Sequence, residues 1–164
     1  MKKGNAMSAI EDRLKEMGLV IPPVKKFDKP NRTGCVQVGS TLYVSGHARE
    51  IGDMPGAKKR GKVGSEVSEA EAYITARGVA LGILSTIKNH AGDLDKVKRV
   101  IRLFGMVNAA PNFERMANVI DGASDFFYEV FGPEFGCHAR SAIGVAELPH
   151  RAPVEINGEF EMHV

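Results

Sequence analysis

One arginine and one glutamate, on two segments joined by a short turn, are the residues of this chain best suited to chemistry. Arg140 lies in the small-residue stretch 138–148, and Glu155 lies in the alternating stretch 154–162. Strand alternation would place only small side chains, such as that of Ala142, beside Arg140 on its face. A guanidinium with such space around it can hold a small carboxylate through two hydrogen bonds.

A cross-strand ion pair is the simpler interpretation of these two residues. An arginine and a glutamate on neighbouring strands commonly pair without forming a ligand site. The ligand-site interpretation predicts that its own chain leaves Arg140 unneutralised and that Glu155 stays accessible to water. An Arg140 locked onto a carboxylate of its own chain, with no cavity in front of it, would exclude that site. The two residue types alone leave both interpretations open.

A second group of candidate residues lies at the end of an expected strand in the N-terminal half. Residues 35–38 and 41–46 flank a Gly-Ser pair, which predicts a two-residue hairpin turn. The second strand ends at Ser45 and Gly46. A glycine in this place either lets backbone approach a ligand closely or marks a bulge, and both remain open.

Capping residues and apolar spacing predict three helices. A short one spans about residues 8–18, a long one spans 68–92, and a third spans 113–131 before Gly132-Pro133. The first two begin with Ser-x-x-Glu capping boxes, and a glycine ends each of them. The long second helix carries many alanines in its apolar stripe, so we expect it to pack closely on a sheet.

Between the two long helices, residues 97–107 predict a long strand. Strict alternation assigns Val97 and Leu103 to one face and Val100 and Phe104 to the other. Apolar residues on both faces indicate that both faces are covered. Two helices, each about 10 Å wide, cover only one face of such a sheet, so the other face requires another chain.

The order of elements predicts an α+β fold. We expect strand, strand, helix, long strand, helix, strand, strand, with an extra strand before the first long helix. This order has no βαβ run, and it fits a mixed sheet with two long helices packed on one face. At 164 residues, we expect a single domain over 1–164 with a helical extension at about 8–18.

Composition and missing motifs narrow the possible functions. A net charge of +2 favours neither nucleic acid nor a membrane surface as partner, and no apolar run reaches transmembrane length. Residues 1–7 lack the apolar core of a signal peptide. Cys35 and Cys137 form no disulfide framework, so we expect reduced thiols in a cytoplasmic protein. The five histidines have no ligand spacing, so we expect no metal, and we find no cofactor motif.

The segments around Arg140 and Glu155 match a known signature. The matching residues are Ala139-Arg140-Ser141, Ile143, Ala146, Leu148 and Val154-Glu155-Ile156. Segments 39–46 and 92–97 match in the same order. From about Gly34 onward the chain therefore resembles the reactive intermediate deaminase (Rid, YjgF-type) family, also called endoribonuclease L-PSP. His138 departs from the pattern, since the family usually has proline or a small residue there.

The resemblance implies a fold like that of trimeric chorismate mutase. In such a homotrimer, three copies join their uncovered sheet faces into a barrel, with clefts between neighbours. It also implies hydrolysis of 2-aminoacrylate-type enamines or imines, made by pyridoxal-phosphate enzymes, to 2-keto acids and ammonia without a cofactor. Arg140 would bind the substrate carboxylate and Glu155 would activate a water. Backbone near Ser45, Gly46 and Ala142 would help to hold the amino group.

Two departures from the family pattern keep other functions open. Many members have cysteine in place of Ala142 and tyrosine near the place of Arg32, which makes Arg32 a candidate binding residue. A homotrimer that binds a small 2-keto or amino acid without catalysis is the second hypothesis. Endoribonuclease, suggested by the family's other name, is the third hypothesis. It is placed last because the sequence shows no histidine pair suited to acid–base chemistry at a phosphate.

Overall fold

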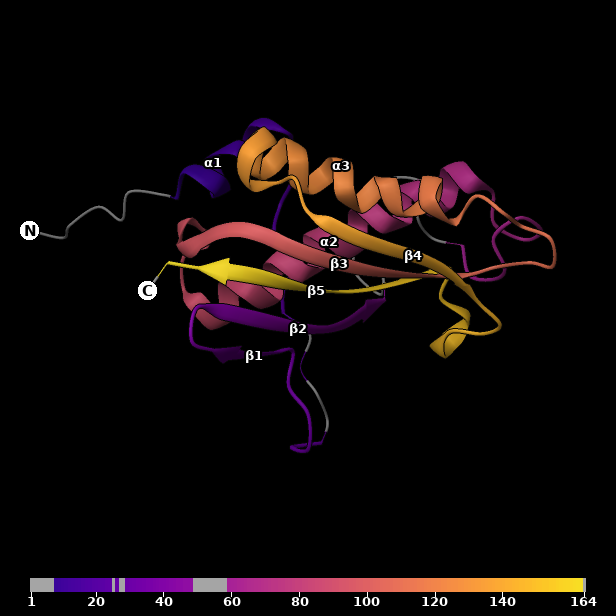
Figure 1. The fold of residues 1–164 in the computed structure, drawn as a ribbon, viewed down its shortest axis with the longest axis horizontal. Coiled ribbons are helices and arrows are strands. Elements are labelled where there is room, and N and C mark those ends of the chain that lie inside the picture. Colours follow the sequence, from indigo (N-terminus) through magenta and orange to yellow (C-terminus); the bar gives the residue numbers. More distant parts are fainter. Residues whose placement is uncertain (1–7, 25, 27–28, 49–58, 164) are drawn as a thin grey trace, which may run out of the picture.

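The computed structural model of the chain describes residues 8–24, 26, 29–48 and 59–163. A five-stranded sheet with the order β1-β2-β5-β3-β4 lies at its centre. The strands are β1 (Cys35–Val38), β2 (Thr41–Ala48), β3 (Val97–Asn108), β4 (Ala139–Val145) and β5 (Val154–Met162). β1 and β4 are the two edge strands, so residues on β4 lie across the sheet from β1 and β2 (Figure 1).

Two long helices, α2 (Glu69–Ala91) and α3 (Met116–Phe135), pack side by side on one face of this sheet (Figure 1). α2 begins at a reciprocal capping box between Ser68 and Glu71 and ends at Gly92, whose φ is 79°. α1 (Ala9–Glu16) packs against α3. The predicted α+β fold, a mixed sheet with two long helices on one face, is confirmed.

α3 connects the only parallel pair of strands, β3 and β4, since the other neighbouring strands of the described sheet are antiparallel. Its regular geometry is interrupted at Gly132, where φ is 79° and where the sequence predicts its end, and a last turn follows. Short 3-10 turns, η1 (Leu94–Lys96) and η2 (Pro149–Arg151), precede β3 and β5. None of the described helices is long and apolar enough to cross a membrane.

The extra strand expected before α2 does not appear in the described part of that segment. Over residues 59–68 the chain forms only isolated bridges, which join Val63 to Val67 and to Ala109. Residues 49–58 lie outside the described residues.

β3 departs from strict alternation, because its register against β5 shifts twice within its first half. Each shift is a bulge that adds one residue to β3. As a result Val97, Val100 and Leu103 all lie in the core and are at most 6% exposed. The prediction that Val100 shares a face with Phe104 is therefore wrong.

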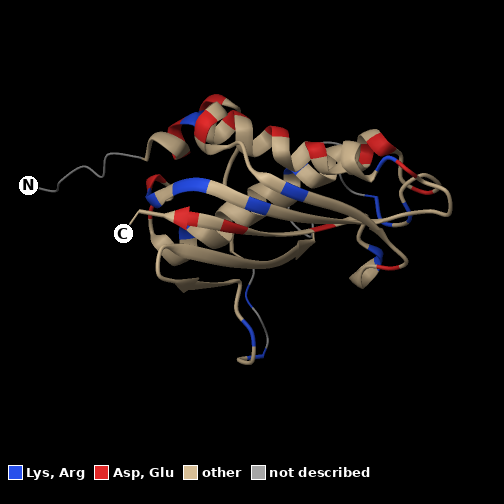
Figure 2. Ribbon diagram, viewed as in Figure 1, with Lys and Arg blue, Asp and Glu red and all other residues tan. Residues whose placement is uncertain are grey.

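The face of the sheet opposite the helices, which we call the open face, carries paired charges along its centre. Arg102 on β3 makes two hydrogen bonds, of 3.0 and 3.2 Å, to Glu159 on β5. Lys98 pairs with Glu161 at 2.8 Å beside them. Figure 2 shows this row of basic positions on β3 next to acidic positions on β5. The open face of a single copy is thus more polar than alternation predicts.

Candidate functional site

Arg140 lies on edge strand β4 and points to the helix side of the sheet. It is paired in register with Leu103 of β3, which is fully buried beneath the helices. Because neighbouring residues in register project to the same face, Arg140 reaches toward α3. Its side chain is 21% exposed. Ala142 follows on the same face and packs against the core.

Two residues of α3 bind the guanidinium of Arg140. Nη1 donates to Asp121 Oδ1 at 2.7 Å and to Ser124 Oγ at 3.0 Å. The expectation that Arg140 has no carboxylate partner in its own chain is therefore wrong. The sequence contains no signal for this pair, since nothing in the spacing of α3 indicates which strand its polar face meets.

His138 extends this network. Its Nδ1 lies 2.6 Å from the carbonyl oxygen of Gly136, and its Nε2 lies 3.0 Å from Ser124 Oγ. Burial lowers the pKa of His138 below its ordinary value, and the charge of Arg140 adds to the shift. The imidazole also packs edge-on against Phe127. The family pattern gave His138 only as a departure, and its contact with Ser124 was not predicted.

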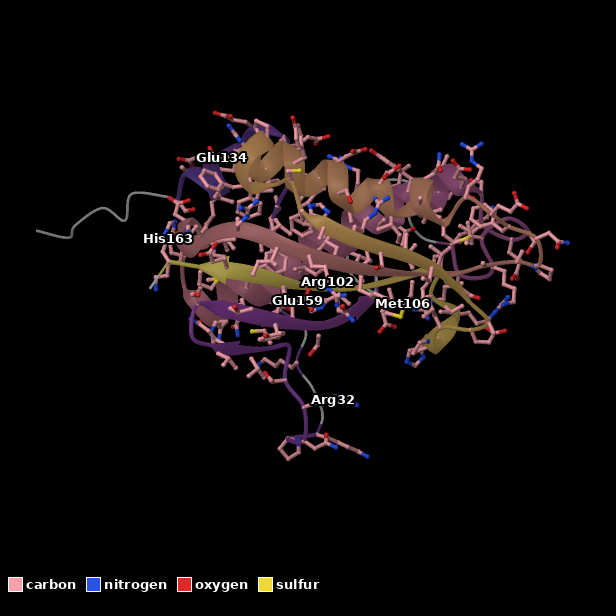
Figure 3. The ribbon with its side chains drawn as sticks, in the orientation of Figure 1. Arg32, Arg102, Met106, Glu134, Glu159 and His163 are labelled. Atoms are coloured by element: carbon pink, nitrogen blue, oxygen red, sulfur yellow. The ribbon has the colours of Figure 1, made fainter. Side chains whose placement is uncertain are left out.

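Glu155 lies on the open face, near the middle of the sheet. It is paired in register with Met106 of β3 on one side and with Ala48 of β2 on the other, and Met106 marks this region in Figure 3. The side chain is half-buried and makes no hydrogen bond or ion pair with any described residue. The carboxylate is therefore available to a water or a ligand.

Gly46 brings backbone against Glu155. A Cβ placed on Gly46 would overlap the carboxylate and also meet its Cδ and Cγ atoms. The register between β2 and β5 shifts between Val44 and His47, so Gly46 also lies in a bulge. The bulge expected as one interpretation of this glycine is confirmed, and the close approach that the structure shows is to the side chain of Glu155.

Ser45 ties the segment before β1 to β2. Its hydroxyl donates to the carbonyl oxygen of Thr33 at 2.7 Å, and its backbone N–H donates to that of Gly34 at 2.9 Å. Arg32 lies on the loop that projects beyond the β1 edge of the sheet (Figure 3). There it lines a groove of about 660 Å³ together with Lys29 and residues of α2.

Five of the six candidate residues form two separate groups in one chain, and Arg32 lies apart from both on the loop before β1. Arg140 and Ala142 lie on the helix side of the β4 edge, whereas Glu155 and Gly46 lie on the open face, with Ser45 beside them. β3 separates β4 from β5, which places the two strands about 10 Å apart. The simple cross-strand ion pair between Arg140 and Glu155 is therefore also wrong.

No group of three or more His, Cys, Asp and Glu side chains in the described ranges could hold a metal ion. The chemistry that this arrangement supports is acid–base work by Glu155 and anion binding by Arg140.

Comparisons with known proteins agree with this fold. The family described as "YjgF/chorismate_mutase-like, putative endoribonuclease" matches residues 11–152. Protein TCP17 of Trypanosoma cruzi is 36% identical over 158 residues, which make up 96% of this chain and 97% of that protein. The crystal structure of Atu1372 from Agrobacterium tumefaciens is 40% identical, with a TM-score of 0.83 over 94% of this chain and 92% of its own.

A structure from Shewanella oneidensis, described as a "putative endoribonuclease", is 28% identical, with a TM-score of 0.84 over 93% of this chain and 99% of its own. The match to the family covers most of the chain, and the similarity to TCP17 covers nearly all of both proteins. The chain therefore belongs to the YjgF family, the reactive intermediate deaminase family that its sequence resembles.

Proposed function

We propose that the chain is an enamine/imine deaminase that hydrolyses small 2-aminoacrylate-type compounds to 2-keto acids and ammonia. The observation that carries this proposal is the state of Glu155. Its carboxylate lies half-buried against the backbone of Gly46 and has no partner among the described residues. A carboxylate in this state can orient a water and take a proton from it.

We further propose that a complete site lies between copies of a homotrimer. Within one copy, Arg140 and Glu155 lie on opposite faces of the sheet, and β3 lies between their strands. A neighbouring copy whose β4 edge packs near β2 and β5 brings its Arg140 to this Glu155. The open face supports such packing, because it exposes two large apolar side chains: Tyr43 on β2 is 49% exposed and Ile143 on β4 is 40% exposed.

In the proposed reaction, Arg140 binds the substrate carboxylate, and the enamine tautomerises to the imine by gaining a proton at carbon and losing one from nitrogen. Glu155 deprotonates a water, whose oxygen attacks the imine carbon and forms a C–O bond. Glu155 passes the proton of the water to the nitrogen, which gives a carbinolamine. The hydroxyl proton of this intermediate then moves to the nitrogen as the C=O bond forms and the C–N bond breaks, so that ammonia leaves and the keto acid remains. Backbone near Ser45, Gly46 and Ala142 helps to hold the amino group. One water is consumed for each ammonia released, and no electrons are transferred.

The test is ammonia release from 2-aminoacrylate that a pyridoxal-phosphate enzyme generates in the assay, compared with spontaneous hydrolysis. We expect the protein to accelerate release and Glu155→Gln to slow the catalysed rate by about 100-fold. Glu159→Gln is the matched control, because Glu159 lies on the same strand and face but pairs with Arg102. Ammonia release at the wild-type rate by Glu155→Gln contradicts the proposal.

A homotrimer that binds a small 2-keto or amino acid without catalysis is the second candidate function. Ala142 and Arg32 favour it, because they stand where many family members have a cysteine and, nearby, a tyrosine. This function predicts saturable binding of pyruvate with no acceleration of ammonia release.

Endoribonuclease is the third candidate, and the names of the family and of the Shewanella oneidensis relative favour it. It predicts RNA cleavage that is lost in Arg140→Ala, measured in a nuclease-free preparation.

A further inference from the structure

The guanidinium of Arg140 is held from one side. Nη1 donates one hydrogen to Asp121 and the other to Ser124. These two residues are three apart on α3 and so lie on one face of the helix. Nε and Nη2 have no hydrogen-bond partner within the described part of the chain. The contacts therefore divide the guanidinium into an occupied side and an unoccupied one.

This division decides how an anion can bind. Arginine has five N–H donors in one rigid plane, and a carboxylate can be held either by Nη1 with Nη2 or by Nε with Nη2. The first edge is blocked here, because both Nη1 hydrogens are already used. The second edge keeps two parallel N–H groups, which suit the two oxygens of a carboxylate.

We propose that Asp121 and Ser124 are positioning residues for Arg140, which fix its guanidinium against α3 so that the Nε–Nη2 edge receives the substrate carboxylate. This inference rests on the proposed function and adds two residues to it. Neither of them touches the substrate in this arrangement, since both contact the far side of the guanidinium.

His138 orients the hydroxyl of Ser124. The carbonyl oxygen of Gly136 can only accept, so Nδ1 of His138 carries the hydrogen, and Nε2 is left as an acceptor. Ser124 therefore donates to Nε2 and turns its lone pairs toward Arg140. Every hydrogen bond from Arg140 through Ser124 and His138 to Gly136 points the same way, which favours one arrangement of the guanidinium.

Two substitutions at Asp121 test whether this residue positions the Arg140 guanidinium or competes with the substrate carboxylate for it. Asp121→Asn keeps the acceptor oxygen and removes the charge, whereas Asp121→Ala removes both. The probe is pyruvate, the product of the proposed reaction, with its dissociation constant measured by isothermal titration calorimetry. We expect Asp121→Asn to bind pyruvate at least as tightly as wild type and Asp121→Ala to bind it about tenfold more weakly. Ser124→Ala is expected to weaken binding about fivefold, and KM should rise by the same factor as the dissociation constant.

A second measurement needs no ligand. ¹⁵N relaxation of the Arg140 Nε–H bond, assigned by its loss in Arg140→Lys, reports how rigidly the guanidinium is held. We expect a high order parameter in wild type and Asp121→Asn, and a clear drop in Asp121→Ala. Glu129→Ala is the matched control, because it removes another ion pair of α3, with Arg77, and leaves Arg140 untouched. It should lower thermal stability without changing pyruvate binding or the Nε–H signal.

Two results overturn the inference. If Asp121→Asn and Asp121→Ala both bind pyruvate more tightly than wild type, Asp121 is a competitor for the guanidinium. If the Nε–H order parameter is unchanged in Asp121→Ala, the contact does not position Arg140. Failure of the proposed function looks different, because wild type then does not accelerate ammonia release, whatever the two Asp121 variants do to pyruvate binding.

Discussion

Gly46 leaves room for the carboxylate of Glu155, and that room is the most specific single-residue feature of the open face. The atoms that a Cβ would meet belong to the end of a flexible, half-exposed side chain. The carboxylate can therefore move away without disturbing the core. A substitution at Gly46 thus tests whether the position of the Glu155 carboxylate matters, because Glu155 itself is kept.

Gly46→Ala is expected to lower ammonia release about as much as Glu155→Gln does, because the new methyl group displaces the carboxylate from the backbone. The free energy of unfolding should fall by less than about 1 kcal/mol, since only a mobile side chain has to move. Steady-state kinetics and urea denaturation of the same preparation check both parts. Wild-type activity in Gly46→Ala would show that the close approach of Gly46 and Glu155 is irrelevant to the reaction.

His138 gives the network around Arg140 a pH dependence. Its pKa is lowered in the folded protein, mainly by burial, so on acidification the unfolded chain takes up a proton before the folded protein does. The stability that neutral His138 contributes is full above the ordinary histidine pKa of about 6.5. It is lost as the pH falls from there through the lower folded pKa.

His138→Gln is expected to remove this part of the pH dependence. The check is urea denaturation of wild type and variant at several pH values between neutral and mildly acidic. The difference between their free energies of unfolding should change across that range and level off at its acidic end. A difference that stays constant with pH would show that His138 does not titrate between the two states.

The sequence predicted the type and order of the helices and strands better than it predicted which residues share a face. The capping box of Ser68 and Glu71 and the closing Gly92 mark α2, and the Gly132-Pro133 pair marks the end of regular geometry in α3. The two bulges of β3 carry no such mark, because each adds one residue without a glycine or proline. The contact of Arg140 with Asp121 was unpredictable for a related reason, since it depends on how far α3 lies along β4.

The crossing of α2 and α3 depends on Gly122. A Cβ at this position would collide with the backbone carbonyl of Tyr73 on α2, which cannot rotate away. In an isolated helix, replacing glycine with alanine stabilises by about 1 kcal/mol. The close contact between α2 and α3 predicts that the same substitution at Gly122 lowers the stability of this protein.

Gly122→Ala is therefore expected to destabilise the protein by about 3 kcal/mol, because the two helices must separate. Chemical denaturation of wild type and variant measures this difference. A more stable Gly122→Ala protein would mean that helix propensity outweighs the contact and that α2 and α3 are not this close.

At the scale of the whole molecule, the separation of Arg140 from Glu155 predicts how mixtures of two inactive variants behave. If each site takes its arginine from one copy and its glutamate from the next, Arg140→Ala and Glu155→Gln proteins can complement each other. Random mixing in a three-membered ring leaves about a quarter of the interfaces with both functional residues.

We therefore expect an equimolar mixture of the two variants, unfolded and refolded together, to regain about a quarter of wild-type ammonia release. Each variant refolded alone is the control and should stay inactive. A mixture as inactive as its parts would mean that both residues serve the same site from one chain, or that copies do not exchange.

The outer side of β4 has no neighbouring strand in the described sheet, and Arg140 lies on this edge strand with its side chain 21% exposed. A row of unpaired backbone groups at such a rim attracts other chains indiscriminately unless something shields it. A second copy of the chain that covers the β4 edge would also bring its Glu155 to the Arg140 of the first copy. The contact that shields the β4 edge would then also complete the site, and a newly synthesised copy would stay inactive until it joined other copies.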